Sequence, residues 1–150
     1  MTDEQMHERA LQHLRTASRV LYLLALLKAF GALIGLKLLT GPAVPPEAGG
    51  WFVQVLREHP QAAPAAIIVW YVTMTALAIA LGRAIGARNE TAAKLGFWFA
   101  LVQIAGIALI TTIPLVALMN VVLGVVLFTT LLLASSFGAF DEPAVISDAK

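Results

Sequence analysis

Four long apolar runs constrain the fold of this chain more than any other feature of its sequence. We place them at residues 20–39, 64–83, 92–111 and 115–137, in a single domain that ends in a polar tail at 138–150. Each run contains about 20 residues, the length that an α-helix needs to cross roughly 30 Å of hydrocarbon. The sequence therefore predicts an all-α integral membrane bundle of four transmembrane helices.

Composition argues against a soluble fold. Hydrophobic residues make up 59% of the chain and charged residues 13%, whereas soluble domains contain about 45–50% and about 25%. A cleaved signal peptide is the alternative interpretation of the first run. That run is longer than the apolar region of a signal peptide, which has about 7–15 residues, and it contains Lys28. We therefore expect it to remain in the protein as a span.

Two further helices are expected outside the spans. The pattern in residues 3–19 predicts an N-terminal amphipathic helical extension that continues into the first span. In the loop after that span, Trp51, Phe52, Val55 and Leu56 fall on one face of a short helix. Aromatic residues favour the membrane–water interface, so we expect an interfacial helix on the outer surface. Packing of this helix on the bundle as a lid is the open alternative.

Basic residues beside the spans are distributed unequally between the two sides of the predicted bundle. With four spans both termini share one side, and that side carries seven basic residues against two on the other. The larger set is Arg9, Arg15, Arg19, Arg83, Arg88, Lys94 and Lys150, and the smaller set is Lys37 and Arg57. Basic residues concentrate in cytoplasmic segments. We therefore predict a multi-pass protein of the bacterial plasma (inner) membrane with both termini in the cytoplasm.

Small residues recur at four-residue spacing in three of the predicted spans. Such residues let helix backbones approach closely in lipid. The packing positions predicted in this way are Gly31, Gly35, Gly82, Gly86 and Gly96. Whether these seams join helices of one subunit or of two subunits stays open at this point.

Lys28 lies near the middle of the first span, where a lysine costs about 2.5–3.5 kcal/mol on insertion scales. At about 100° per residue, Gly31 and Gly35 lie toward the same side of the helix, so Lys28 is directed into packing rather than into lipid. Counting depth along the helices brings Gln103 and Thr75 to a similar level. We predict an intramembrane polar cluster of Lys28, Thr75 and Gln103, with the amine either hydrogen-bonded or neutral.

Lys28 then has two interpretations. It lines a path for an anion or substrate, or it is a tolerated lysine that extends to the interface or binds a lipid headgroup. No Asp or Glu lies in a predicted span, so an intramembrane ion pair within one subunit is excluded. In the fourth span, Asn120 lies near the depth of Tyr71, and we predict an inter-helix hydrogen bond there.

The sequence contains no set of residues suited to catalysis or to a cofactor. It has no cysteine, and His7, His13 and His59 all lie outside the predicted spans. A haem, an iron–sulfur cluster or a thiolate metal site inside the bundle is therefore not expected. Phosphate-binding glycine loops, zinc motifs and acid–base pairs at one depth are also missing. We predict no enzymatic activity, no metal, no cofactor and no nucleic-acid partner.

These features favour a small polytopic membrane protein that acts as a non-enzymatic accessory, scaffold or assembly subunit through helix–helix packing. Its expected partners are the lipid bilayer and either copies of itself, as a homo-oligomer, or a larger membrane complex. The alternative is a small homo-oligomeric transporter or channel whose route is lined by Lys28, Thr75 and Gln103.

Overall fold

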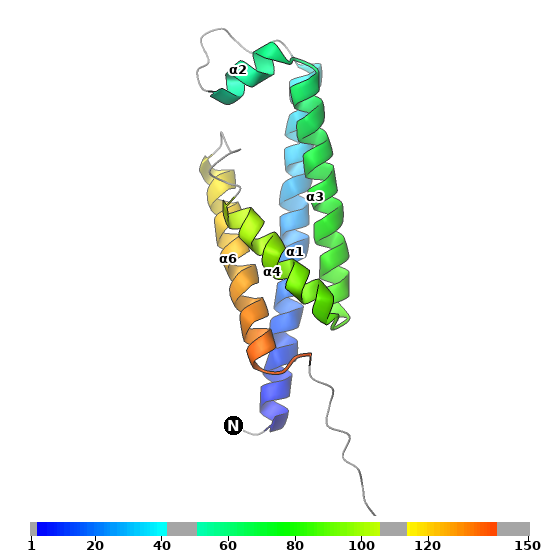
Figure 1. Ribbon diagram of the computed structural model, residues 1–150, viewed down its shortest axis with the longest axis vertical. Coiled ribbons are helices and arrows are strands. Elements are labelled where there is room, and N and C mark those ends of the chain that lie inside the picture. Colours follow the sequence, from blue (N-terminus) through cyan, green and yellow to red (C-terminus); the bar gives the residue numbers. More distant parts are fainter. Residues whose placement is uncertain (1–2, 42–50, 106–113, 141–150) are drawn as a thin grey trace, which may run out of the picture.

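The computed structural model describes residues 3–41, 51–105 and 114–140, and every element of regular structure in these ranges is a helix. In chain order the helices are α1 (Asp3–Thr40), α2 (Trp51–Glu58), α3 (Ala62–Gly86), α4 (Glu90–Ala105) and α6 (Pro114–Ser136) (Figure 1). Three of them, α1, α3 and α6, are long and apolar enough to cross a membrane. The all-helical fold with several membrane-length helices is therefore confirmed.

The predicted third span, 92–111, coincides with α4 only in part. The structure describes 16 residues of α4, which at 1.5 Å per residue is about 24 Å of helix. The rest of that span and the turn after it fall at 106–113, outside the described residues. The described helices alone do not establish a fourth crossing.

α1 is one continuous helix of 38 residues, so the predicted extension at residues 3–19 and the first span belong to the same element. Its first turns bury Ala10, Leu14 and Ala17, each exposed by 2% or less. There the ring of His13 stacks on Phe137, the residue that directly follows α6, with the ring centroids 5.8 Å apart. The N-terminal turns of α1 therefore lie beside the C-terminal turns of α6.

α3 packs along α1 in the opposite direction, and Figure 1 shows the two helices side by side over most of their length. Glycines on both helices make this approach close. The nearest side chains at these positions pair Gly31 with Tyr71, Gly35 with Ile68, Gly82 with Tyr22 and Gly86 with Ser18. The Ser18 hydroxyl also donates a hydrogen bond to the Gly82 carbonyl oxygen at 2.8 Å. Small residues thus seat the side chains of the facing helix.

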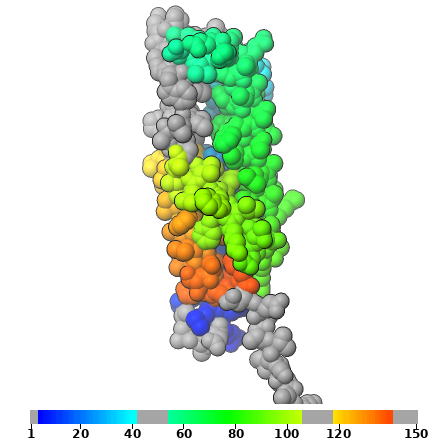
Figure 2. Space-filling view, in the orientation of Figure 1, coloured from blue at the N-terminus to red at the C-terminus, as the bar shows by residue number. Residues whose placement is uncertain are grey.

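α4 crosses obliquely in front of α1 in Figure 1 and packs mainly on α6. At Gly96 an added Cβ would meet the Cδ1 atoms of Ile85 and Leu131, each at 3.0 Å. Gly96 therefore lets α4 approach α3 and α6 together. Figure 2 shows α3, α4 and α6 forming one side of an elongated body.

A tight turn connects α3 to α4. Arg88 adopts a left-handed backbone conformation with φ of 59°, and the amides of Arg88 and Asn89 donate to the carbonyls of Ile85 and Ala84. This pair of hydrogen bonds is the Schellman arrangement that ends many helices. Asn89 then accepts a hydrogen bond from the Ala92 amide at 2.9 Å, which caps the start of α4. The chain therefore reverses within a few residues.

Large apolar side chains face outward on α1, α3, α4 and α6. Leu26, Val69, Trp98 and Leu118 are between 58% and 69% exposed. Water would penalise an apolar surface of this extent, whereas lipid covers it at no cost. The outer surface of the helices is therefore suited to a bilayer.

Candidate functional site

Lys28 is a buried basic residue at the meeting point of α1, α3 and α6. Only 7% of the residue is exposed. Its Nζ atom donates a hydrogen bond to Oδ1 of Asn120 on α6 at 2.7 Å, and it lies 5.8 Å from the centroid of the Tyr71 ring on α3. An amide oxygen and an aromatic face both stabilise a cation. The site therefore provides Lys28 with favourable contacts from two other helices.

Gly31 determines how closely the Tyr71 ring approaches α1. A Cβ atom at position 31 would lie 2.5 to 2.7 Å from three ring atoms of Tyr71, closer than atoms can pack. Gly31 follows Lys28 by about one helical turn, so a ring seated on Gly31 also faces the lysine amine. The glycine and the lysine therefore form one local arrangement.

The structure places the other predicted polar residues near this site without joining them to the amine. The Thr75 hydroxyl donates to the Tyr71 carbonyl oxygen in its own helix at 2.7 Å. Gln103 is only 4% exposed and packs against Gly124, one turn of α6 from Asn120. Lys28 donates its hydrogen bond to Asn120, the residue predicted to pair with Tyr71.

Depth counting missed the Lys28–Asn120 pair because it compares only the levels of backbone atoms. The long side chain of lysine bridges a difference in level between two helices, which such a count does not represent. The sequence contains two amide side chains within the predicted spans, Gln103 and Asn120, and both were candidates for the amine of Lys28. Strong polar groups in lipid tend to find one another across helices.

The contacts of this site are a hydrogen bond to an amide and the approach of an aromatic ring, without a carboxylate among the described residues around Lys28. No Asp or Glu occurs within the described membrane-length helices beyond the first turns of α1. Every fully buried side-chain nitrogen or oxygen in the described part of the chain has a hydrogen-bond partner. In the same ranges, no group of three or more His, Cys, Asp or Glu residues is placed to hold a metal ion.

The predicted packing glycines all face side chains of their own chain. Gly31, Gly35, Gly82 and Gly86 lie against the partner helix in the α1–α3 pair, and Gly96 lies against α3 and α6. The seams that they form are thus within one subunit. A contact between two copies of the chain would have to use other surfaces.

The structure has a short helix, α2, at Trp51–Glu58. Leu56 is 6% exposed and Val55 is half-buried, and α2 contacts α3. The side chains of Trp51 and Phe52 lie outside the described part of the structure. Burial of Leu56 agrees with packing on the bundle, and the interfacial location stays a prediction.

Comparison with known proteins adds no family to this description. No family model matches the chain, no curated protein matches it and no solved structure matches it. The functional argument therefore depends on the residues and contacts of this chain.

Proposed function

We propose that the chain is a four-span accessory or assembly subunit of a bacterial inner-membrane complex, with both termini in the cytoplasm and no catalytic role. The observation that carries this proposal is the hydrogen bond between Lys28 and Asn120 at 2.7 Å. The charged side chain inside the bundle is used to connect helices, as the packing glycines are. The residues of the interior then hold the helices together, and the outer surface is available to lipid and to partner helices.

The directions of the helices support a fourth crossing. The end of α3 packs against Ser18, and Asn120 of α6 accepts a hydrogen bond from the side chain of Lys28, ten residues further along α1. α6 begins six residues before Asn120, so its start lies roughly 24 Å beyond the level of Ser18 at 1.5 Å per residue, apart from the difference in level that the lysine side chain bridges. The chain between α3 and α6 must cover this distance along the bundle, and the length of α4 accounts for most of it.

Single-cysteine labelling tests the topology cleanly because the natural chain contains no cysteine. We expect Glu8→Cys, Ala87→Cys and Ser136→Cys to react with an impermeant maleimide only after the cytoplasmic side is opened. His59→Cys should react in intact cells. Reaction of Ser136→Cys in intact cells, with Glu8→Cys protected, would contradict four spans.

Purification of the full chain in a mild detergent distinguishes the accessory role from the alternative function. We expect the chain to elute with larger membrane proteins that are identified by mass spectrometry, and Lys28→Met to weaken this association only as far as it weakens folding. A symmetric assembly of the chain alone, with ion or solute flux in vesicles that Lys28→Met abolishes, would instead favour the transporter lined by Lys28, Thr75 and Gln103. That outcome would refute the accessory role.

A further inference from the structure

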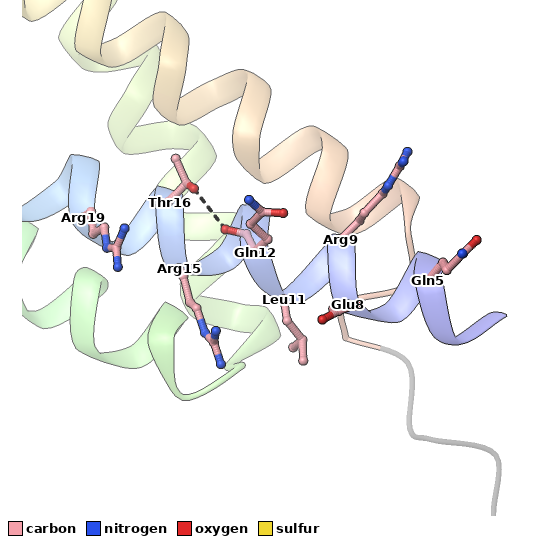
Figure 3. Close-up of a pocket in the computed structure, with 8 residues that line it drawn as sticks. All are labelled: Gln5, Glu8, Arg9, Leu11, Gln12, Arg15, Thr16 and Arg19. Atoms are coloured by element: carbon pink, nitrogen blue, oxygen red, sulfur yellow. Dashed lines mark hydrogen bonds between the residues drawn. The ribbon is translucent and has the colours of Figure 1, made fainter. Parts of the chain in front are cut away.

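The N-terminal part of α1 presents a basic concave surface where the polar turns of the helix meet its apolar turns. It is lined by one face of this helix, with Arg9, Arg15 and Arg19 among its residues (Figure 3). Arg15 and Arg19 extend to one side of α1 in this view, and Arg9 extends to the other.

Arg15 and Arg19 are spaced to act on one anion. They are four residues apart in α1, so their Cβ atoms are about 5–6 Å from each other on one face. Both residues are exposed, and within the described residues neither forms an ion pair with a carboxylate. Glu8 lies on the same face but two turns away from Arg15, about 10 Å along the axis. Two adjacent guanidinium groups match the oxygens of a phosphate group.

The residues directly above this pair are apolar and exposed. Leu23 and Leu26 follow Arg19 by one and two helical turns, on the same face, and are 52% and 58% exposed. Phe30, one turn further, is 57% exposed. One face of α1 thus passes from paired guanidinium groups to a strip of large apolar side chains. A molecule with an anionic head and an apolar tail matches both parts, whereas free phosphate matches only the first.

We propose that Arg15 and Arg19 bind the phosphate of an anionic phospholipid whose acyl chain lies along Leu23, Leu26 and Phe30. This depends on the insertion of α1 in a bilayer and is independent of the accessory role. Basic residues at the boundary of a span attract anionic headgroups, by roughly 1 kcal/mol each near the surface. Arg19 immediately precedes the apolar run and is therefore at the depth of the headgroup phosphates.

Native mass spectrometry of the full chain tests this binding. The purified protein is incubated with phosphatidylglycerol or with phosphatidylcholine of the same acyl chains, and the retained lipids are counted. We expect preferential retention of phosphatidylglycerol, and a loss of at least about tenfold in its affinity in the Arg15→Gln/Arg19→Gln variant. Both side chains are exposed, and an unchanged circular dichroism spectrum would show that the variant remains folded.

Arg83→Gln/Arg88→Gln is the matched control. It removes the same charge from exposed positions at the same end of the bundle, and we expect it to retain the lipid within about twofold. An equal loss in both double variants would show general attraction to a basic surface and would overturn the proposal. Equal retention of the two lipids, or displacement of phosphatidylglycerol by a large excess of inorganic phosphate, would also overturn it.

Discussion

The two halves of α1 have opposite polarity arrangements. In residues 3–19, which we call the polar half, Ala10, Leu14 and Ala17 are buried, and Gln12 and Arg15 are exposed. In residues 20–40, the apolar half, many large hydrophobic side chains are exposed and Lys28 is 7% exposed, whereas Lys37 near the end of the helix is exposed. One uninterrupted helix is therefore suited to two solvents. The change in polarity near Arg19 and Val20 is the one expected of a helix that passes from water into lipid.

The largest effect is expected where a charge is placed on the lipid-facing side of the apolar half. Leu26 is 58% exposed, and Leu26→Arg should destabilise the inserted protein by about 2.5–3.5 kcal/mol because lipid does not solvate the guanidinium group. Gln12→Arg, at an exposed position of the polar half, should change stability by less than about 0.5 kcal/mol. Unfolding in mixed micelles and the yield of integrated protein measure both variants. Equal tolerance would show that both halves face water.

Removal of the acceptor for Lys28 should have the next largest effect. Asn120→Leu leaves the buried amine without its 2.7 Å hydrogen bond, which should cost about 1.5–3 kcal/mol. In the Lys28→Met background the same change should cost much less, because the amine is no longer present. A double-mutant cycle in mixed micelles measures this coupling. A coupling energy near zero would show that the pair does not stabilise the bundle.

Gly31→Ala should destabilise the bundle by about 1–3 kcal/mol, because the new methyl group forces the Tyr71 ring away from α1. Gly86→Ala is its control, since a Cβ there would lie at an ordinary 3.6 Å from Ser18 Oγ. That variant should be neutral or slightly stabilised, as expected for alanine in a helix. The midpoints of thermal unfolding in detergent distinguish the two. Equal midpoints for the two variants would contradict the requirement for glycine at position 31 beside the Tyr71 ring.

The smallest effect is expected at the boundary between the two halves. Ser18→Ala removes the hydrogen bond to the Gly82 carbonyl oxygen on α3, and such bonds between membrane helices contribute about 0.6 kcal/mol on average. Thr16→Ala should cost less, because the Thr16 hydroxyl donates to Gln12 within its own helix. Repeated denaturant titrations resolve a difference of this size. A larger loss of stability for Thr16→Ala than for Ser18→Ala would contradict a stabilising role of the hydrogen bond between Ser18 and Gly82.

Much of the fold was predictable from hydropathy because long apolar runs must become helices in lipid. The predicted span at 20–39 lies within α1, and the span at 64–83 lies within α3. The span at 115–137 lies within α6 except for its last residue. Ends were less accurate, since α3 continues to Gly86 with helical hydrogen bonds that hydropathy does not detect. Periodicity also indicated that Lys28 faces inward, because small residues share its side of the helix.

The partner of Lys28 was not predictable from one sequence. Its identity depends on which helices are neighbours, and α1 contacts both α3 and α6, which lie on either side of it in Figure 1. Nothing in the spacing of residues along a single helix specifies this order. The spacing of the glycines likewise does not specify whether they pack on the same chain or on another copy. The contacts between α1 and α3 show that they pack within one chain.

The continuity of α1 has a mechanical consequence. A helix of 38 residues is about 57 Å long, nearly twice the roughly 30 Å of a hydrocarbon core, and it contains no proline at which to bend. The polar half and the apolar half are therefore expected to move together as one segment. A partner or membrane surface that tilts the first turns also shifts Lys28 relative to Asn120, so their hydrogen bond would be strained by such a movement.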